Sequence, residues 1–315
     1  EMAKGVQMGV FIGSADKLSP EDNITREQAF LVLARAIKLM NPSETALDAF
    51  SDKDSVSSWA KDAMACMVQE GYVQGSGGKL NPKAYITRAE FAQVMDNVFK
   101  HYISAAGEYT EDYTGNVMVN VSGVTLKGLT INGDLIIGDG VGEGTVTLDG
   151  VVVTGRLVVR GGGVNSVRII GGSDVKNIII ARVDGKVRVF IERGTTVEEV
   201  TVDGDEDVII DGDIDTLAIL EPDITVTLAG GKVQTALILG ENSRLIVGPN
   251  AEVDTIAVVA PNVDIEVEGA VNQIGFTENG DGGTVSGTGK VGNVASYADD
   301  VVVTTIGAVV YAGQG

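Results

Sequence analysis

The sequence contains little cysteine, few aromatic residues, little positive charge and no long apolar run. Its 315 residues include 1 Cys, 1 Trp, 7 Tyr and 7 Phe, and the single Cys66 excludes a disulfide within the chain. The 23 Lys and Arg residues face 44 Asp and Glu residues, and the resulting net charge of −21 makes nucleic acid a poor partner. No stretch of about 18 apolar residues is present, so no membrane span is expected.

The remaining composition is globular and divides into two parts. Hydrophobic residues make up 44% of the chain and charged residues 21%, which favours an ordered fold, and the length suits two domains of roughly 100–200 residues each. Residues 1–101 contain 11 basic and 13 acidic side chains, a net charge of −2, whereas residues 102–315 contain 12 and 31, a net charge of −19. Two different kinds of fold are therefore expected in one chain.

Residues 1–101 predict helices. Thr25 with Gln28, and Thr87 with Glu90, match the Ser/Thr-x-x-Glu/Gln capping box, and apolar residues at helical spacing follow each of them. Three motifs occur twice at a constant offset of 62: G-x3-G at residues 9 and 71, K-L-x-P at 17 and 79, and I-T-R at 24 and 86. A constant offset indicates two copies of one helix–loop–helix unit.

Four motifs in this region resemble the S-layer homology (SLH) module: Phe50-Ser-Asp52, Ser58-Trp-Ala60, Gly71-x3-Gly75 and Ile86-Thr-Arg-Ala-Glu-Phe91. The resemblance covers a full module at 49–101 and a partial module at 1–40, whose beginning is expected to lie before Glu1. It implies a secreted bacterial protein at the cell wall or cell surface (S-layer). The partner that it implies is a secondary cell-wall polysaccharide or another peptidoglycan-linked glycan.

The family's glycan-facing positions correspond to Asp52, Trp59, Gly75 and Arg88 in the full module, with Arg26 from the partial one. Arginine suits an anionic sugar substituent because its planar fork pairs with carboxylates. Taken alone, the two arginines are also consistent with ordinary helix-start surface residues, and Trp59 with core packing.

From about residue 116 the sequence changes to short Val, Ile and Leu runs separated by Gly, Asp and Asn, which is typical of strands and turns. A strand-like unit recurs at 131, 153, 175, 197, 214, 233, 253, 271 and 291. A period of about 20 residues predicts a parallel β-helix at 116–315, in which stacked turns share one core. The predicted hand is right, because the hexapeptide repeats of left-handed forms are absent. Residues 102–115 show no sustained period and are expected to be a linker. The expected fold is thus two-domain, with all-α SLH-type repeats followed by an all-β right-handed parallel β-helix (solenoid).

The β-helix lacks the residues that most sugar-processing sites use. Phe190 and Phe276 are the only aromatic residues between 114 and 296, and His101, the only histidine of the chain, lies outside that range. We therefore expect a non-catalytic surface or assembly module rather than an enzyme. The alternatives are a wall-anchored polysaccharide lyase or glycosidase with its site on the β-helix face, and a glycan-binding adhesin.

Charge is unevenly distributed along the predicted β-helix. Eight basic residues fall between Arg156 and Arg193, whereas beyond them 21 acidic residues face only Lys232, Arg244 and Lys290. This pattern is consistent with a solvated surface. It also suggests self-association between copies, or attraction of an anionic wall polymer to the basic band.

Carboxylates concentrate in one stretch of this domain, at Asp203, Asp205, Asp207, Asp211 and Asp213. Clustered Asp side chains with Gly corners suit calcium, which takes six to eight oxygen ligands. The spacing is not that of an EF-hand, and Asp is also common at β-corners. Apart from this calcium hypothesis, no cofactor is expected.

Overall fold

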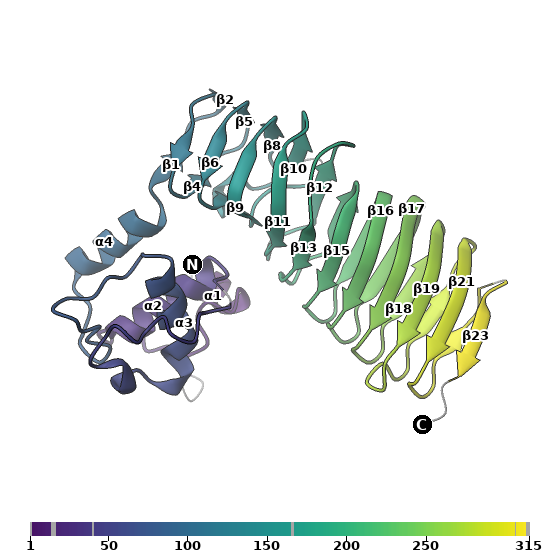
Figure 1. Cartoon of the computed structure of the whole chain (residues 1–315), viewed down its shortest axis with the longest axis horizontal. Helices are drawn as coiled ribbons and strands as arrows, with labels where there is room; N and C mark the ends of the chain where they lie inside the picture. Colours follow the sequence, from purple (N-terminus) through teal and green to yellow (C-terminus); the bar gives the residue numbers. More distant parts are fainter. Residues whose placement is uncertain (1, 14–16, 40, 165–166, 306, 313–315) are drawn as a thin grey trace. The chain divides into compact units, whose positions relative to one another are not determined.

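The computed structural model describes residues 2–13, 17–39, 41–164, 167–305 and 307–312. The chain divides into two compact units, Glu1–Lys100 and His101–Gly315. The first is helical and the second is a parallel β-solenoid, as Figure 1 shows. The predicted order of a helical region followed by a parallel β-helix is confirmed.

The described residues of the helical unit form four α-helices and two 3-10 turns. These are α1 (Met2–Gln7), α2 (Arg26–Ala36), η1 (Lys53–Ser55), η2 (Ser58–Ala60), α3 (Lys61–Gln69) and α4 (Arg88–Val98). Both predicted capping boxes are present, since the Thr25 and Thr87 side chains accept from the backbone N–H of Gln28 and Glu90 at the starts of α2 and α4. The core of the unit forms around fully buried Phe30, Met64, Met67 and Leu80.

The two copies of the helix–loop–helix repeat meet directly. Thr25 and Tyr85 form an isolated antiparallel bridge. Beside it, the Arg26 N–H donates to the Ala84 carbonyl (2.9 Å) and the Ile86 N–H donates to the Ile24 carbonyl (3.1 Å). The segments 24–26 and 84–86 lead into the equivalent helices α2 and α4, so the starts of these two helices are tied to each other.

The second unit consists mainly of strands and the corners between them, and β16 and β17 are its two longest described strands, with 14 and 15 residues. The strands are β1 (His101–Ile103), β2 (Gly107–Tyr109), β3 (Tyr113–Thr114), β4 (Val117–Val119), β5 (Val124–Lys127), β6 (Thr130–Asn132), β7 (Leu135–Ile137), β8 (Val146–Asp149), β9 (Val152–Val159), β10 (Val167–Ile170), β11 (Asp174–Ile180), β12 (Val187–Ile191), β13 (Glu199–Val202), β14 (Val208–Asp211), β15 (Ile214–Ile219), β16 (Thr225–Ile238), β17 (Arg244–Val258), β18 (Asp264–Val267), β19 (Ala270–Phe276), β20 (Thr284–Ser286), β21 (Lys290–Ser296), β22 (Val302–Val303) and β23 (Val309–Ala312), with a 3-10 turn η3 (Asp139–Val141) between β7 and β8.

These strands stack in parallel ladders over about 10 turns. One ladder runs from β1 through β4, β7, β9, β11, β13 and β15 to β16, β17, β19, β21 and β23. Its inward positions pair like with like, as in the register Leu135–Leu157–Ile178. Register is fixed by this core, because a slip of one residue would turn every apolar side chain to the opposite face. The predicted right hand of the coil stays a prediction.

The first turn of the solenoid lies where the sequence predicted a linker over residues 102–115. Strands β1, β2 and β3 pair in parallel with β4, β5 and β6. Ile103 is buried, and Tyr109 and Tyr113 pack against the solenoid core. Tyrosines thus take the places that Val, Ile and Leu occupy in later turns, which hid the period in the sequence.

One corner of the later turns is a column of left-handed residues. Asp223, Asn242 and Asn262 have φ angles of 58°, 56° and 56°. The Asn242 amide donates to Asp223 Oδ1 (3.1 Å), and the Asn262 amide donates to Asn242 Oδ1 (3.1 Å). Asn and Asp tolerate this backbone better than other side chains, so the column satisfies both the backbone and the hydrogen bonds of the corner.

Candidate functional site

Arg26, predicted to face a glycan, is held inside the helical unit. Its Nε donates to the Leu80 carbonyl (2.9 Å) and its Nη1 donates to Glu90 Oε1 (2.7 Å). The guanidinium also lies over the Phe30 ring, 5.2 Å from the centroid. Only 13% of the side chain is exposed. Arg26 therefore joins the two repeats and has little of its donor fork available for a ligand.

Asp52, which belongs to the full module at 49–101, binds the backbone of Leu80 as Arg26 does. Its Oδ1 accepts from the Leu80 N–H (2.9 Å) and its Oδ2 accepts from the Asn81 N–H (2.8 Å). Burial opposes ionisation, but these two backbone donors outweigh it and lower the pKa of Asp52 below its ordinary value. Asp52 and Arg26 thus fix opposite sides of the Leu80–Asn81 segment.

Gly75 begins the turn that leads into this segment. Its φ is +68°, and a Cβ atom built there would lie 2.5 Å from the Lys79 carbonyl oxygen and 2.7 Å from Phe50 Cε1. The turn closes when the Ser76 N–H donates to the Lys79 carbonyl (2.8 Å). Glycine is required here by backbone conformation and by space, whatever ligand lies nearby.

Trp59 and Arg88 are the two predicted residues that face solvent. Trp59 lies in η2 and is 50% exposed. Arg88 opens α4, is exposed, and makes no hydrogen bond or ion pair within the described part of the chain. Of the five predicted positions, these two have aromatic surface and guanidinium donors available to a ligand.

A buried acidic residue near Trp59 was not predicted. Glu27 is 3% exposed; its Oε2 accepts from the Ser57 N–H (3.0 Å), and its Oε1 accepts from Ser57 Oγ (3.0 Å) and Lys83 Nζ (2.7 Å). Ser57 immediately precedes η2, so Glu27 holds the turn that carries Trp59. The sequence does contain a signal for Glu27. The equivalent position of the second repeat, 62 residues later, is Ala89, so the first copy has a carboxylate that the second lacks.

The basic band predicted in the first half of the solenoid is largely neutralised. Six of its members pair with carboxylates: Arg156 with Asp134, Arg160 with Asp139, Lys176 with Glu198, Arg182 with Glu143, Lys186 with Asp207 and Arg188 with Asp211. A seventh, Arg168, lies over the Phe190 ring at 5.6 Å. The geometry therefore gives no support to an open basic surface that attracts an anionic polymer.

The Asp203–Asp213 stretch extends over β14 and the corners on both sides of it, and several of its carboxylates have protein partners. Asp207 accepts from the Thr225 N–H (2.9 Å) and pairs with Lys186 (3.2 Å), while Asp211 pairs with Arg188. Burial opposes ionisation of Asp207, but the Thr225 and Lys186 donors lower its pKa. Among the described residues, no group of three or more His, Cys, Asp or Glu is placed to hold a metal ion. The calcium hypothesis finds no support in this geometry.

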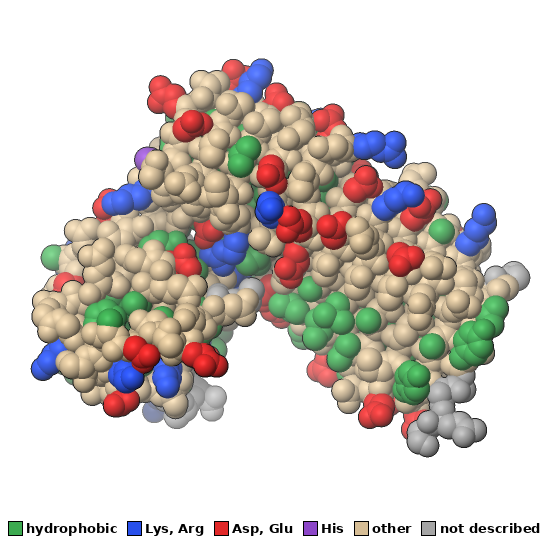
Figure 2. Space-filling model, in the orientation of Figure 1, with side chains coloured by type: hydrophobic (Ala, Val, Ile, Leu, Met, Phe, Trp, Pro, Cys, Tyr) green, Lys and Arg blue, Asp and Glu red, His purple; other side chains and the backbone are tan. Residues whose placement is uncertain are grey.

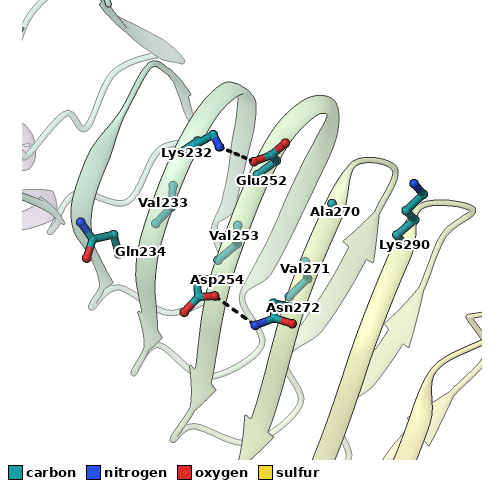
Figure 3. Close-up of a pocket in the computed structure, with 10 residues that line it drawn as sticks. All are labelled: Lys232, Val233, Gln234, Glu252, Val253, Asp254, Ala270, Val271, Asn272 and Lys290. Atoms are coloured by element: carbon teal, nitrogen blue, oxygen red, sulfur yellow. Dashed lines mark hydrogen bonds and ion pairs between the residues drawn. The ribbon is translucent and has the colours of Figure 1, made fainter. Parts of the chain in front are cut away.

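A groove on the later turns of the solenoid was also not predicted from the sequence. It has a volume of about 440 Å³ and crosses β16, β17, β19 and β21 (Figure 3). One rim is a row of residues in register: Lys232, Glu252, Ala270 and Lys290. The other rim consists of polar side chains: Gln234, Asp254 and Asn272. Val233, Val253 and Val271 lie between the rims.

Hydrogen bonds link neighbouring turns along the groove. Lys232 Nζ pairs with Glu252 (2.9 Å), and the Asn272 amide donates to Asp254 Oδ1 (3.1 Å). Pairing with Glu252 raises the pKa of Lys232, so this ammonium stays charged at neutral pH. The groove therefore has polar side chains along both rims and an apolar floor of valines, with Lys232 and Lys290 at its two ends.

Comparison with known proteins identifies the helical region. The family model described as the S-layer homology domain matches residues 1–30 and 49–92. Similar curated proteins are the Surface-layer 125 kDa protein of Lysinibacillus sphaericus (36% identical over 105 residues, 32% of this chain and 9% of that protein) and Exoglucanase XynX of Acetivibrio thermocellus (30% over 91 residues, 28% and 8%). Amylopullulanase of Thermoanaerobacterium thermosulfurigenes is 31% identical over 91 residues, 28% of this chain and 5% of that protein.

The chain spans less than a tenth of the length of these relatives. No solved structure gives a significant match to it. Domains of the matched family bind cell-wall polymers and mark proteins anchored at the cell surface. None of the described helices has the length and apolar character needed to cross a membrane.

Proposed function

We propose that the N-terminal unit, an S-layer homology region, holds this chain at the bacterial cell wall by binding a wall-linked polysaccharide. The observation that carries the proposal is the exposure of Trp59 and Arg88 in a unit whose other predicted residues are fixed by internal bonds. Trp59 offers an apolar face to a sugar ring. The free guanidinium of Arg88 pairs with an anionic substituent on the polymer.

Arg26, Asp52 and Gly75 have a different role in this proposal. They hold the Gly75–Asn81 loop and the starts of α2 and α4 in place, and they act on the ligand only through that frame. The family resemblance placed all five residues at the glycan. We assign direct contact to Trp59 and Arg88, and positioning to the other three.

The test is binding of the full chain to purified cell-wall polysaccharide, measured by calorimetry. We expect Trp59→Ala and Arg88→Ala each to weaken binding by about tenfold or more, since each removes a direct contact worth on the order of 1.4 kcal/mol. Tyr85→Ala, which removes another exposed aromatic ring, and Lys53→Ala, which removes another exposed cation, are the matched controls. Unchanged binding in both test variants would contradict the proposal.

For the solenoid we propose a rigid, non-catalytic surface module. Support comes from the continuous parallel register of its ladders and from the protein partners that occupy its charged side chains. Two relatives are named as an exoglucanase and an amylopullulanase, so catalysis is the alternative to exclude. Incubation with neutral and acidic polysaccharides should release neither reducing ends nor unsaturated products. Release that a solenoid variant abolishes would establish the lyase or glycosidase alternative.

A further inference from the structure

The groove across β16, β17, β19 and β21 is lined by two lysines, although basic residues are rare in this part of the chain. Beyond Arg193 the chain has 21 acidic residues and only three basic ones, Lys232, Arg244 and Lys290. Two of these three line the groove. The third, Arg244, forms ion pairs with Asp264 (3.2 Å) and with Glu266. Figure 2 shows Asp and Glu side chains spread over the visible face of the solenoid.

The two lysines stand at opposite ends of one row. The register Lys232–Glu252–Ala270–Lys290 places them three strands apart. At about 4.8 Å per strand they are separated by roughly 14 Å along the solenoid axis. Lys232 is paired with Glu252, whereas Lys290 makes no ion pair within the described part of the chain. The row therefore ends in an ammonium group with its donors available.

The opposite rim presents mainly hydrogen-bond acceptors. The Gln234 amide nitrogen donates to Asp215 Oδ1 (2.7 Å) and the Asn272 amide nitrogen donates to Asp254 Oδ1 (3.1 Å). These bonds fix the amide planes and leave the carbonyl oxygens of Gln234 and Asn272 as acceptors, while each amide keeps one N–H as a donor. A ligand that complements this rim must carry many donors, at intervals close to the strand spacing.

We propose that this groove is a second binding site, which takes an extended, neutral, hydroxyl-rich polysaccharide chain lying along the solenoid axis. Sugar hydroxyls donate to the Gln234 and Asn272 carbonyls and to the Asp254 carboxylate. Lys290 donates to ring or hydroxyl oxygens at the end of the groove. A polyanion is disfavoured because the surrounding turns are strongly acidic. The site is separate from the S-layer homology region, so it equips the chain to hold two glycans at once.

The experiment uses the full chain and two soluble probes, a neutral β-glucan and polygalacturonate, in affinity electrophoresis and calorimetry. The double variant Gln234→Ala/Asn272→Ala and the single variant Lys290→Ala test the two rims. The double variant Asn132→Ala/Asn177→Ala and the single variant Lys176→Ala remove the same chemical groups from exposed positions of earlier turns. Trp59→Ala serves in parallel to separate binding at the helical unit from binding at the groove.

We expect the β-glucan to bind the unmodified chain and the Trp59→Ala chain equally, and each groove variant to weaken that binding by about tenfold or more. The control variants should bind as the unmodified chain does. The proposal is overturned by no binding of the β-glucan, by an equal effect of the groove and control variants, or by preferential binding of polygalacturonate. Loss of β-glucan binding in Trp59→Ala alone would move the site to the helical unit and also overturn it.

Discussion

Replacing Gly75 by alanine should destabilise the helical unit far more than replacing Gly77, its neighbour in the same turn. Both residues have a left-handed backbone, with φ of +68° and +58°, so each alanine carries a conformational cost of about 1–2 kcal/mol. A Cβ atom on Gly77 meets nothing within 4 Å. On Gly75 it would lie 2.5 Å from the Lys79 carbonyl oxygen and 2.7 Å from Phe50 Cε1.

The collision at Gly75 has two consequences. Displacing the Lys79 carbonyl weakens the Ser76 N–H hydrogen bond that closes the turn, at a cost of about 1 kcal/mol. Displacing the buried Phe50 ring disturbs the core, where misfit costs about 1–3 kcal/mol. The sum is about 3–6 kcal/mol for Gly75→Ala, against about 1–2 kcal/mol for Gly77→Ala.

Thermal unfolding followed by tryptophan fluorescence measures this difference. Trp59 is the only tryptophan of the chain, so its signal reports the helical unit alone. For a domain of this size 1 kcal/mol shifts the midpoint by about 4–8 °C, so Gly77→Ala should lower Tm by about 4–16 °C and Gly75→Ala by at least about 12 °C. Equal midpoints for the two variants would refute the steric reasoning. Equal midpoints with polysaccharide binding lost only in Gly75→Ala would instead return Gly75 to the glycan-facing role.

Three further predictions concern the frame of each unit. Asp52 has a lowered pKa in the folded chain, so its ionised form stabilises the helical unit above pH about 4, and that contribution is lost as the pH falls through the folded pKa. The Tm of Asp52→Asn should accordingly be lower than that of the unmodified chain at pH 7, and the difference should shrink on acidification; a constant difference would contradict the assignment. In the corner column, Asn262→Ala should cost the solenoid about 1–3 kcal/mol in chemical denaturation, and Asn262→Gly less, because glycine keeps the left-handed backbone and loses only the side-chain bond to Asn242. Ile256→Ala removes a fully buried core side chain and should lower the free energy of unfolding of the solenoid by about 2–5 kcal/mol, with faster hydrogen exchange in β17 and its neighbouring strands. Trp59 fluorescence should be unchanged, and a matching loss of stability in the helical unit would contradict the division into two units.

The elements of the helical unit were predictable because their signals are local. Thr25 and Thr87 begin helices through contacts that reach only three residues, and both capping boxes form as the sequence predicted. The roles of Arg26 and Asp52 depend on Leu80, Asn81 and Glu90, which lie far away in the chain. The family resemblance identified these residues as important, and only the folded structure separates positioning from exposure.

The solenoid was predictable for a different reason, and its first turn shows the limit. Inward Val, Ile and Leu residues recur because each must stack on its counterpart in the turn before. This requirement makes the apolar pattern of the sequence periodic. The turn at 101–114 fills the same core with Ile103, Tyr109 and Tyr113, so the pairing persists while the composition changes. A repeating pattern of Val, Ile and Leu therefore predicts stacked turns, but a turn can stack without following that pattern.

The groove follows from the same rule applied to outward positions. Once the inward rows fix the register, residues such as Lys232, Glu252 and Lys290 must stand in line whether or not they interact. Ala270 interrupts their row with a small side chain, and this contributes a hollow that longer side chains would fill. No requirement of the core selects these outward residues, so folding alone does not explain why two of the last three basic residues of an acidic chain line that hollow. Their selection is the reason to look for a ligand there.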